Sequence, residues 1–223
     1  CIRDSYIAGH VIEHTGGLFV RTIHDTEDYV ERFEKGCRES GVTCERLTIN
    51  EILDLEPNLR RDIVLEGFFV NDAAIDPFKL TLMNMLDALN NGAEILTYHE
   101  VVDFIKRGNQ VIGVIAKDKI RGHLKEFYSD IVINATGAWS GRLGSKLGLK
   151  IPSRPSKGSL IVFSRRIFNM VINRLRQPSD GDIFVPSYST TILGTTSIEV
   201  NNPDDFTTLD SELITIYLSL IHI

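Results

Sequence analysis

Two runs of strand-forming residues, joined by a glycine-containing turn, constrain the fold of this chain most strongly. Residues 101–106 and 111–116 are rich in valine and isoleucine, and Gly108-Asn109 lies between them. A short turn of this kind between two such runs is typical of a β-hairpin. The sequence therefore predicts an antiparallel pair of strands, which excludes an all-helical fold.

A well-marked helix precedes the hairpin. Asp76 is expected to cap its N-terminus, Pro77 suits the first helical position, and Gly92 ends it. Apolar side chains recur between them at the 3.6-residue spacing of a helix. These side chains are Leu80, Met83, Leu86 and Leu89.

The remaining patterns alternate between strands and short helices. Strands are predicted at 18–20, 66–70 and 128–133. Asp25 is expected to cap a helix that ends at Gly41, and Thr48 with Glu51 forms a capping box for a second helix, which stops near Pro57. Hairpin-joined strands with a few capped helices favour an α+β fold, an antiparallel or mixed sheet with helices on one face.

Composition narrows the classes of function. The 223 residues are 43% hydrophobic and carry a net charge of -6, which argues against a general nucleic-acid or anionic-membrane binder. Cys1, Cys37 and Cys44 contain no C-x-x-C pair, and His10 with His14 lacks a third ligand, so no disulfide framework or metal site is predicted. We expect a cytoplasmic protein without a transmembrane segment, because the sequence contains neither a signal peptide pattern nor a long apolar run.

Residues 131–140 carry the most informative pattern. The apolar run 131–133 predicts a buried strand, Gly137 a turn, and residues 140–147 a helix. A glycine lets the backbone approach a ligand closely, and the start of a helix offers N–H groups to an anion. The same pattern also occurs in plain connections between elements, so taken alone it leaves both interpretations open.

Five segments in the same order resemble the FAD-dependent glycerol-3-phosphate dehydrogenases of the D-amino-acid-oxidase-like superfamily, and most of all their anaerobic, large-subunit branch. The segments are N-A-T-G-A-W-S at 134–140, the Asp-Pro helix entry at 71–80, the G-A-x-x-L-T strand at 92–101, R-P-S-K-G-S at 154–159 and I-L-G-T-T-S at 192–197. Together they span about residues 14–214. The resemblance implies oxidation of glycerol 3-phosphate to dihydroxyacetone phosphate by FAD, with the electrons passed to a quinone or to a partner electron-transfer subunit.

The departures from the family pattern are equally specific. The sequence has no G-x-G-x-x-G after a first strand, the fingerprint that binds the FAD pyrophosphate. We therefore expect a central fragment of such an enzyme that holds no FAD by itself. The expected parts are residues 14–130 as the first part of the substrate domain with one FAD-domain hairpin, 131–150 as a strand-helix remnant of the FAD-binding domain, 151–214 as the second part of the substrate domain, and 215–223 as a tail.

The same resemblance assigns cofactor contacts. Val101 corresponds to a backbone contact with the adenine, and the turn at 134–139 lies beside the flavin. The expected cofactor residues are Val101, Asn134, Ala135, Gly137 and Trp139. The catalytic base is not assigned.

A basic segment supports anion binding independently of the resemblance. No Asp or Glu occurs between Asp130 and Asp180, whereas nine Lys and Arg residues do. Such clusters hold phosphates or carboxylates, although a solvated basic face has the same composition. Few aromatic residues accompany the bases, which disfavours nucleic acid as the anion. The expected substrate contacts are Arg154, Lys157, Arg174, Arg176, Thr195 and Thr196.

Two alternatives remain open at this point. An amine or amino-acid oxidase of the same superfamily would hold a carboxylate, for which one arginine would suffice. A non-catalytic anion-binding domain could share the fold without the chemistry. Attachment to the inner face of the membrane as a peripheral protein is compatible with the cytoplasmic expectation.

Overall fold

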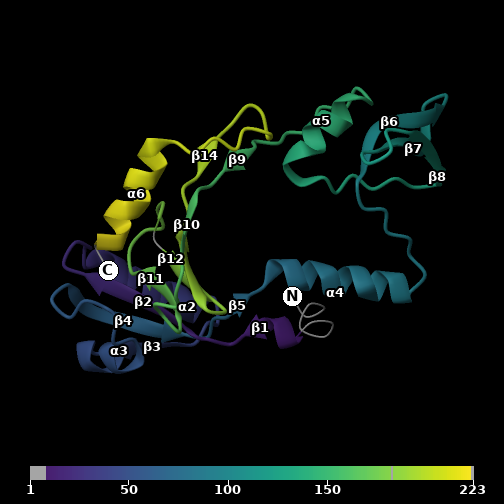
Figure 1. The fold of residues 1–223 in the computed structure, drawn as a ribbon. Helices are drawn as coiled ribbons and strands as arrows, with labels where there is room; N and C mark the ends of the chain where they lie inside the picture. Colours follow the sequence, from purple (N-terminus) through teal and green to yellow (C-terminus); the bar gives the residue numbers. More distant parts are fainter. Residues whose placement is uncertain (1–8, 182, 222–223) are drawn as a thin grey trace. The chain divides into compact units, whose positions relative to one another are not determined.

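The computed structural model describes residues 9–181 and 183–221 of the chain, which divide into two compact units (Figure 1). The first unit contains the residues up to Asp87, Gly158–Ser197 and those from Thr207 onward. The second unit contains Ala88–Lys157 and Ile198–Phe206. The chain therefore enters the second unit twice, once through each of these segments.

A seven-stranded mixed sheet forms the centre of the first unit, in the order β10-β13-β12-β11-β2-β4-β3. Its neighbours pair antiparallel except β2 and β11, which run parallel in the middle. The strands are β2 (Gly17–Thr22), β3 (Cys44–Leu47), β4 (Val64–Val70), β10 (Leu160–Phe163), β11 (Val171–Arg174), β12 (Ile183–Ser187) and β13 (Thr190–Gly194). The strands predicted at 18–20 and 66–70 are confirmed as β2 and β4.

Helices cover both faces of this sheet. On one face Leu18 belongs to a core cluster that includes Ile52 of α3 (Ile49–Leu55) and Ile216 of α6 (Asp210–Ile221), and α6 contacts β13. On the other face the ring of Phe33, in α2 (Asp28–Glu39), lies 4.6 Å from that of Phe19. The α+β class is confirmed, but the expectation of helices on one face is wrong. Successive apolar residues in β2 already indicate burial on both sides.

The N-terminus of α2 differs from the sequence prediction. The helix begins at Asp28, and Glu27 occupies the N-cap position without a side-chain cap bond. Asp25 instead accepts hydrogen bonds from the backbone N–H and the hydroxyl of Thr22, at 2.9 and 2.7 Å. Its carboxylate also pairs with Arg174, which is far away in the sequence. Asp25 therefore makes a tertiary ion pair instead of capping the helix.

The other helix starts are confirmed. Thr48 and Glu51 form the predicted reciprocal capping box at α3. Asp76 Oδ1 accepts from the backbone N–H groups of Phe78 and Lys79, both at 3.0 Å, at the start of α4 (Pro77–Asn90). The first unit also contains the short strands β1 (Ile12–Glu13) and β5 (Ala74–Ile75), which pair antiparallel, and the turn η1 (Gly9–Val11).

The second unit contains the predicted hairpin. Strands β6 (His99–Arg107) and β7 (Gln110–Asp118) pair antiparallel, and β8 (Leu124–Tyr128) extends them to three strands. A second, two-stranded sheet joins β9 (Ser156–Lys157) to β14 (Ile198–Glu199). Between these sheets lie the turn η2 (Gly137–Trp139) and the helix α5 (Ser140–Ser145).

The strand predicted at 128–133, continuing into the glycine turn, does not form. Strand β8 ends at Tyr128, and residues 131–136 have no strand partner among the described residues. Ile131 and Ile133 are consequently exposed, at 76% and 83%. A strand is stable only when a neighbour satisfies its backbone groups, and sequence pattern alone cannot supply that neighbour.

The predicted domain parts stay a prediction. Residues 99–118, which contain the expected FAD-domain hairpin, and residues 131–150, the expected FAD-domain strand and helix, lie in one compact unit. Residues 215–221, predicted as part of a tail, continue α6. Which of these parts contact cofactor and which contact substrate stays a prediction.

Candidate functional site

A cavity of about 670 Å³ lies in the second unit, between the start of β6 and the region of η2 and α5. Its lining combines aliphatic, aromatic and cationic side chains. The lining residues are His99, Glu100, Val101, Val102, Thr136, Trp139, Arg142, Leu143 and Lys146. Two segments that the sequence singled out separately, residues 92–101 and the turn at 134–140, therefore meet at one cavity. The strand expected within 92–101 forms only from His99 onward, where β6 begins.

Local hydrogen bonds shape the turn beside this cavity. Asn134 Oδ1 accepts from the hydroxyl of Thr136 at 2.7 Å, and Asn134 Nδ2 donates to the carbonyl of Ser140 at 3.1 Å. Gly137 has a φ of +54°, which L-residues with a side chain rarely adopt, and no atom lies within 4 Å of where its Cβ would stand. The amide of Asn134 thus holds together the turn that Gly137 makes possible.

Two side chains from this turn share one carboxylate. Asp204 accepts from the indole Nε1 of Trp139 and from Nη2 of Arg142, each at 2.7 Å, and Arg142 also donates to Asn202 at 2.9 Å. The hydrogen bond from Trp139 and the charge and hydrogen bond of Arg142 lower the pKa of Asp204. Asp204 is therefore ionised at neutral pH. Sequence patterns do not single out this residue, because it lies outside the basic segment and far from Trp139 along the chain.

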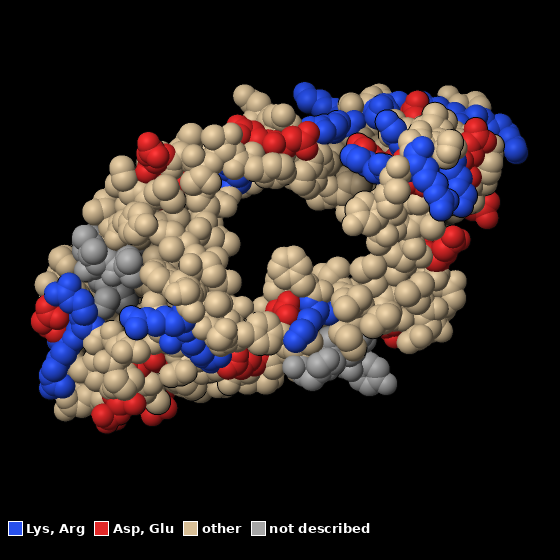
Figure 2. All heavy atoms as spheres, in the orientation of Figure 1, with Lys and Arg blue, Asp and Glu red and all other residues tan. Residues whose placement is uncertain are grey.

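The second unit is more basic than the chain as a whole. It contains eleven Lys or Arg residues against nine Asp or Glu, whereas the whole chain has a net charge of -6. Figure 2 shows Lys and Arg side chains over β6–β8 and α5, with acidic side chains among them. Among the residues that line the cavity, Arg142 and Lys146 are cationic and Glu100 is anionic.

Arg154 and Lys157, two of the expected substrate contacts, also lie in the second unit. Arg154 is 84% exposed and pairs with Glu199 at 2.6 Å. Lys157 belongs to β9, where it pairs with Ile198 of β14. The short β9–β14 sheet thus places both cations close together along one segment.

The other expected substrate contacts lie in the first unit, and all four have internal partners. The hydroxyl of Thr195 donates to the carbonyl of Thr196 at 3.0 Å. Arg174 is buried and pairs with Asp25, so its charge is compensated inside the fold. Arg176 donates to the hydroxyl of Ser179 at 2.6 Å. The hydroxyl of Thr196 donates to buried Glu212 at 2.7 Å.

Thr195 and Thr196 pack tightly against the segment that follows Lys157. The backbone N–H of Ser159 donates to the hydroxyl of Thr196 at 2.9 Å, and Ser159 Oγ donates to Glu212 at 3.0 Å. A Cβ on Gly158 would approach the carbonyl oxygen of Thr196 to 2.6 Å. This close approach explains why the basic K-G-S segment contains glycine at 158.

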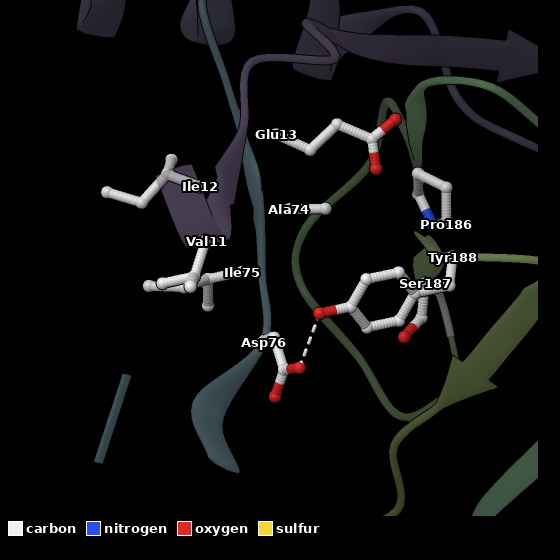
Figure 3. Close-up of a pocket in the computed structure, with 9 residues that line it drawn as sticks. All are labelled: Val11, Ile12, Glu13, Ala74, Ile75, Asp76, Pro186, Ser187 and Tyr188. Carbon is white, nitrogen blue, oxygen red and sulfur yellow. Dashed lines mark hydrogen bonds between the residues drawn. The ribbon is translucent and has the colours of Figure 1, made fainter. Parts of the chain in front are cut away.

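One of the cavities of the first unit has a volume of about 280 Å³ (Figure 3). The close-up shows the Tyr188 hydroxyl directed at Asp76, to which it donates at 2.5 Å. The ammonium of Lys79 lies 4.6 Å from the centre of the Tyr188 ring, and the hydrogen bond from Tyr188 lowers the pKa of Asp76. Its two carboxylates, Glu13 and Asp76, already have partners, which makes it a weaker ligand site than the larger cavity.

Two further properties concern only the residues that the structure describes. Across 9–181 and 183–221, three or more His, Cys, Asp or Glu side chains do not gather in a way that could hold a metal ion. Over the same residues, none of the helices combines the length and apolar character needed to cross a membrane.

Comparisons with known proteins identify the sequence relationship. The family model described as "DAO: FAD dependent oxidoreductase" matches residues 4–221. The chain is 41% identical over 219 residues to a subunit of the anaerobic glycerol-3-phosphate dehydrogenase of Haloferax volcanii, covering 92% of this chain and 37% of the relative. It is 36% identical over 219 residues to the corresponding subunit of the Escherichia coli K12 enzyme, covering 96% and 40%. The chain thus spans about two fifths of the length of these relatives.

Solved structures agree on the fold. L-proline dehydrogenase from P. horikoshii superposes with a TM-score of 0.81 at 22% identity, covering 100% of this chain and 59% of that one. Glycerol-3-phosphate dehydrogenase from Bacillus halodurans, complexed with FAD, superposes with a TM-score of 0.73 at 23% identity, covering 99% and 42%. At these identities the superpositions establish the architecture alone.

Proposed function

Because the chain belongs to the DAO family of FAD-dependent oxidoreductases, we propose that it is the central part of an anaerobic-type glycerol-3-phosphate dehydrogenase. The observation that carries the proposal is 36% to 41% identity to one subunit of such enzymes over most of the chain. The alternative of an amine or amino-acid oxidase has only a shared fold in its favour. The relatives and solved structures described above are enzymes, so they do not support the alternative of a non-catalytic anion-binding domain.

The larger cavity suits part of the FAD molecule. Aliphatic side chains and the indole of Trp139 can contact a planar ring, while Arg142 and Lys146 can face phosphate oxygens. The proposed cofactor contacts remain Val101, Asn134, Ala135, Gly137 and Trp139. The pyrophosphate fingerprint is missing from the sequence, so we propose that these residues hold only one side of the cofactor and that the isolated chain does not retain it.

In the proposed reaction the secondary alcohol of glycerol 3-phosphate becomes the ketone of dihydroxyacetone phosphate, and its hydroxyl proton passes to a base that is not assigned. FAD, when bound, supplies the acceptor for the hydride that leaves the alcohol carbon. The residues of this chain bind and orient the substrate, and their main electrostatic task is to neutralise the phosphate dianion. The proposed phosphate contacts are Arg154 and Lys157, and Arg176, Thr195 and Thr196 are second-line candidates. Arg174 is no longer proposed, because it is buried and its charge is compensated by Asp25.

The structure adds one constraint on Arg154. Glu199 accepts a hydrogen bond from its guanidinium at 2.6 Å, and both side chains are more than half exposed. A substrate phosphate would therefore compete with that carboxylate for the guanidinium. An exposed pair of this kind contributes about 0.2–1 kcal/mol, which a phosphate dianion can outweigh.

Steady-state kinetics of the full-length enzyme test this assignment. Lys157→Ala and Arg154→Ala are each expected to raise KM for glycerol 3-phosphate by about ten- to a hundredfold, because a charge-assisted hydrogen bond contributes about 1.5–3 kcal/mol. Glu199→Gln should lower KM because it releases Arg154. Unphosphorylated glycerol at high concentration is the control substrate, with which these differences should vanish. Equal losses on both substrates would contradict the assignment.

The electron acceptor and location complete the proposal. We propose that the electrons reach a quinone, directly or through a partner electron-transfer subunit, and that the enzyme is cytoplasmic or peripheral at the inner face of the membrane. Both points follow from the resemblance to the anaerobic branch. Quinone reduction by membranes that contain the full-length enzyme, compared with membranes that lack it, is the measurement that decides them.

A further inference from the structure

Asp204 stands out because it contacts two walls of the larger cavity without lining the cavity itself. Its Oδ1 accepts from the indole of Trp139 and its Oδ2 from the guanidinium of Arg142. The segment that carries it, Ile198–Phe206, is the part of the second unit contributed by the second passage of the chain. Neither the family resemblance nor the sequence patterns assign this residue a role.

The two side chains that Asp204 holds would otherwise have several conformations. Trp139 is 38% exposed and the Arg142 side chain 52% exposed, so packing alone does not fix them. Each immobilised side chain costs about 0.5–1.5 kcal/mol when binding has to order it. A carboxylate that orders both in advance removes that cost from ligand binding.

We infer that Asp204 is a positioning residue of the cofactor pocket, which presets the indole of Trp139 and the guanidinium of Arg142 for a nucleotide cofactor. The inference rests on the proposed function, because it takes the cavity to hold part of FAD. Asn202 supports the arrangement through its own hydrogen bond from Arg142 at 2.9 Å. Asp204 does not itself touch the ligand, since it is not among the residues that line the cavity.

The isolated chain offers a direct measurement, because Trp139 is its only tryptophan. We expect Asp204→Ala to change the Trp139 emission maximum and to lower its fluorescence anisotropy, since the indole loses its acceptor and moves more freely. Asp204→Asn should give an intermediate result, because the amide oxygen still accepts from the indole but no longer attracts Arg142. Asp205→Asn, which changes the neighbouring carboxylate, is the matched control and should leave both signals unchanged. Emission and anisotropy that stay the same in Asp204→Ala would overturn the inference.

FAD affinity of the full-length enzyme provides the second readout. We expect Asp204→Ala to raise the Kd for FAD by about tenfold, in line with two side chains that binding must then order. Trp139→Leu and Arg142→Gln test the pocket itself. If these two variants weaken FAD binding and Asp204→Ala does not, the positioning role is refuted while the proposed pocket stands. If none of the three weakens it, the cavity does not hold the cofactor, and both the inference and this part of the proposed function fail.

Discussion

The buried ion pair between Asp25 and Arg174 makes the stability of the first unit sensitive to the loss of either partner alone. Arg174 ends β11 and Thr22 ends its parallel neighbour β2, so the carboxylate of Asp25 joins the ends of the two central strands. The Asp25 and Arg174 side chains are 0% and 2% exposed. Removing one partner of a buried pair leaves the other charge uncompensated, which typically costs about 3–5 kcal/mol.

Asp25→Ala should therefore lower the melting temperature by about 10 °C, since about 1 kcal/mol shifts a protein of this size by about 2–4 °C. Thermal unfolding followed by circular dichroism measures this shift. The double variant Asp25→Asn with Arg174→Met should lose less than the sum of the single variants, because it leaves no buried charge unpaired. Asp62→Ala is the control, since it removes a close but exposed Asp–Arg pair and should change the melting temperature little. If Asp25→Ala behaves like this control, the reasoning is refuted.

Two further predictions concern buried polar groups and close packing. Burial raises the pKa of Glu56 from its ordinary value of 4.5, against the opposing hydrogen bonds from Met170 and Asn169 and the charge of Arg166. A carboxyl group whose pKa is higher in the folded chain than in the unfolded chain stabilises the fold at pH values below its unfolded pKa. This contribution is lost as the pH rises through the folded pKa. The Glu56→Gln variant should therefore gain stability relative to the natural chain as the pH increases above 4.5. Urea unfolding measures the free energy of unfolding of both chains, and a difference between them that stays constant with pH would argue against the prediction. Gly158→Ala should lower the free energy of unfolding by about 1–3 kcal/mol, because its Cβ would meet Thr195 and Thr196. Gly36→Ala is the control and should not destabilise the protein, because its Cβ would meet nothing within 4 Å. Equal stabilities of the two variants would contradict the argument from close packing at Gly158.

Local patterns in the sequence determined most of the elements. The hairpin at 99–118, the Asp76-Pro77 helix start and the Thr48–Glu51 capping box all depend on residues a few positions apart, and all three form as predicted. The family also follows from the sequence, because its motifs are short and contiguous. These features were predictable because the interactions that create them lie within one turn or one hairpin.

The tertiary structure decided the features that depend on distant residues. Asp25 pairs with Arg174 instead of capping the helix as expected. Residues 131–136 do not form the predicted strand, because a strand needs a neighbouring strand to pair with. The partners of the bases in the basic segment, residues 131–179, were also decided by the tertiary structure. At least four of the nine bases in this segment pair with carboxylates from elsewhere in the chain. These pairs are Arg142 with Asp204, Arg154 with Glu199, Arg166 with Glu13 and Arg174 with Asp25.

The sequence alone therefore established that basic residues gather in one segment, but not how much of their charge is compensated. Charge pairing depends on distance in space, and a carboxylate such as Asp204 reaches Arg142 only after the chain has returned to the second unit through β14. Spacing along the sequence contains no information about that return. The types of side chain at the site were fixed by the sequence, whereas their partners, and hence their available charge, were fixed by the fold.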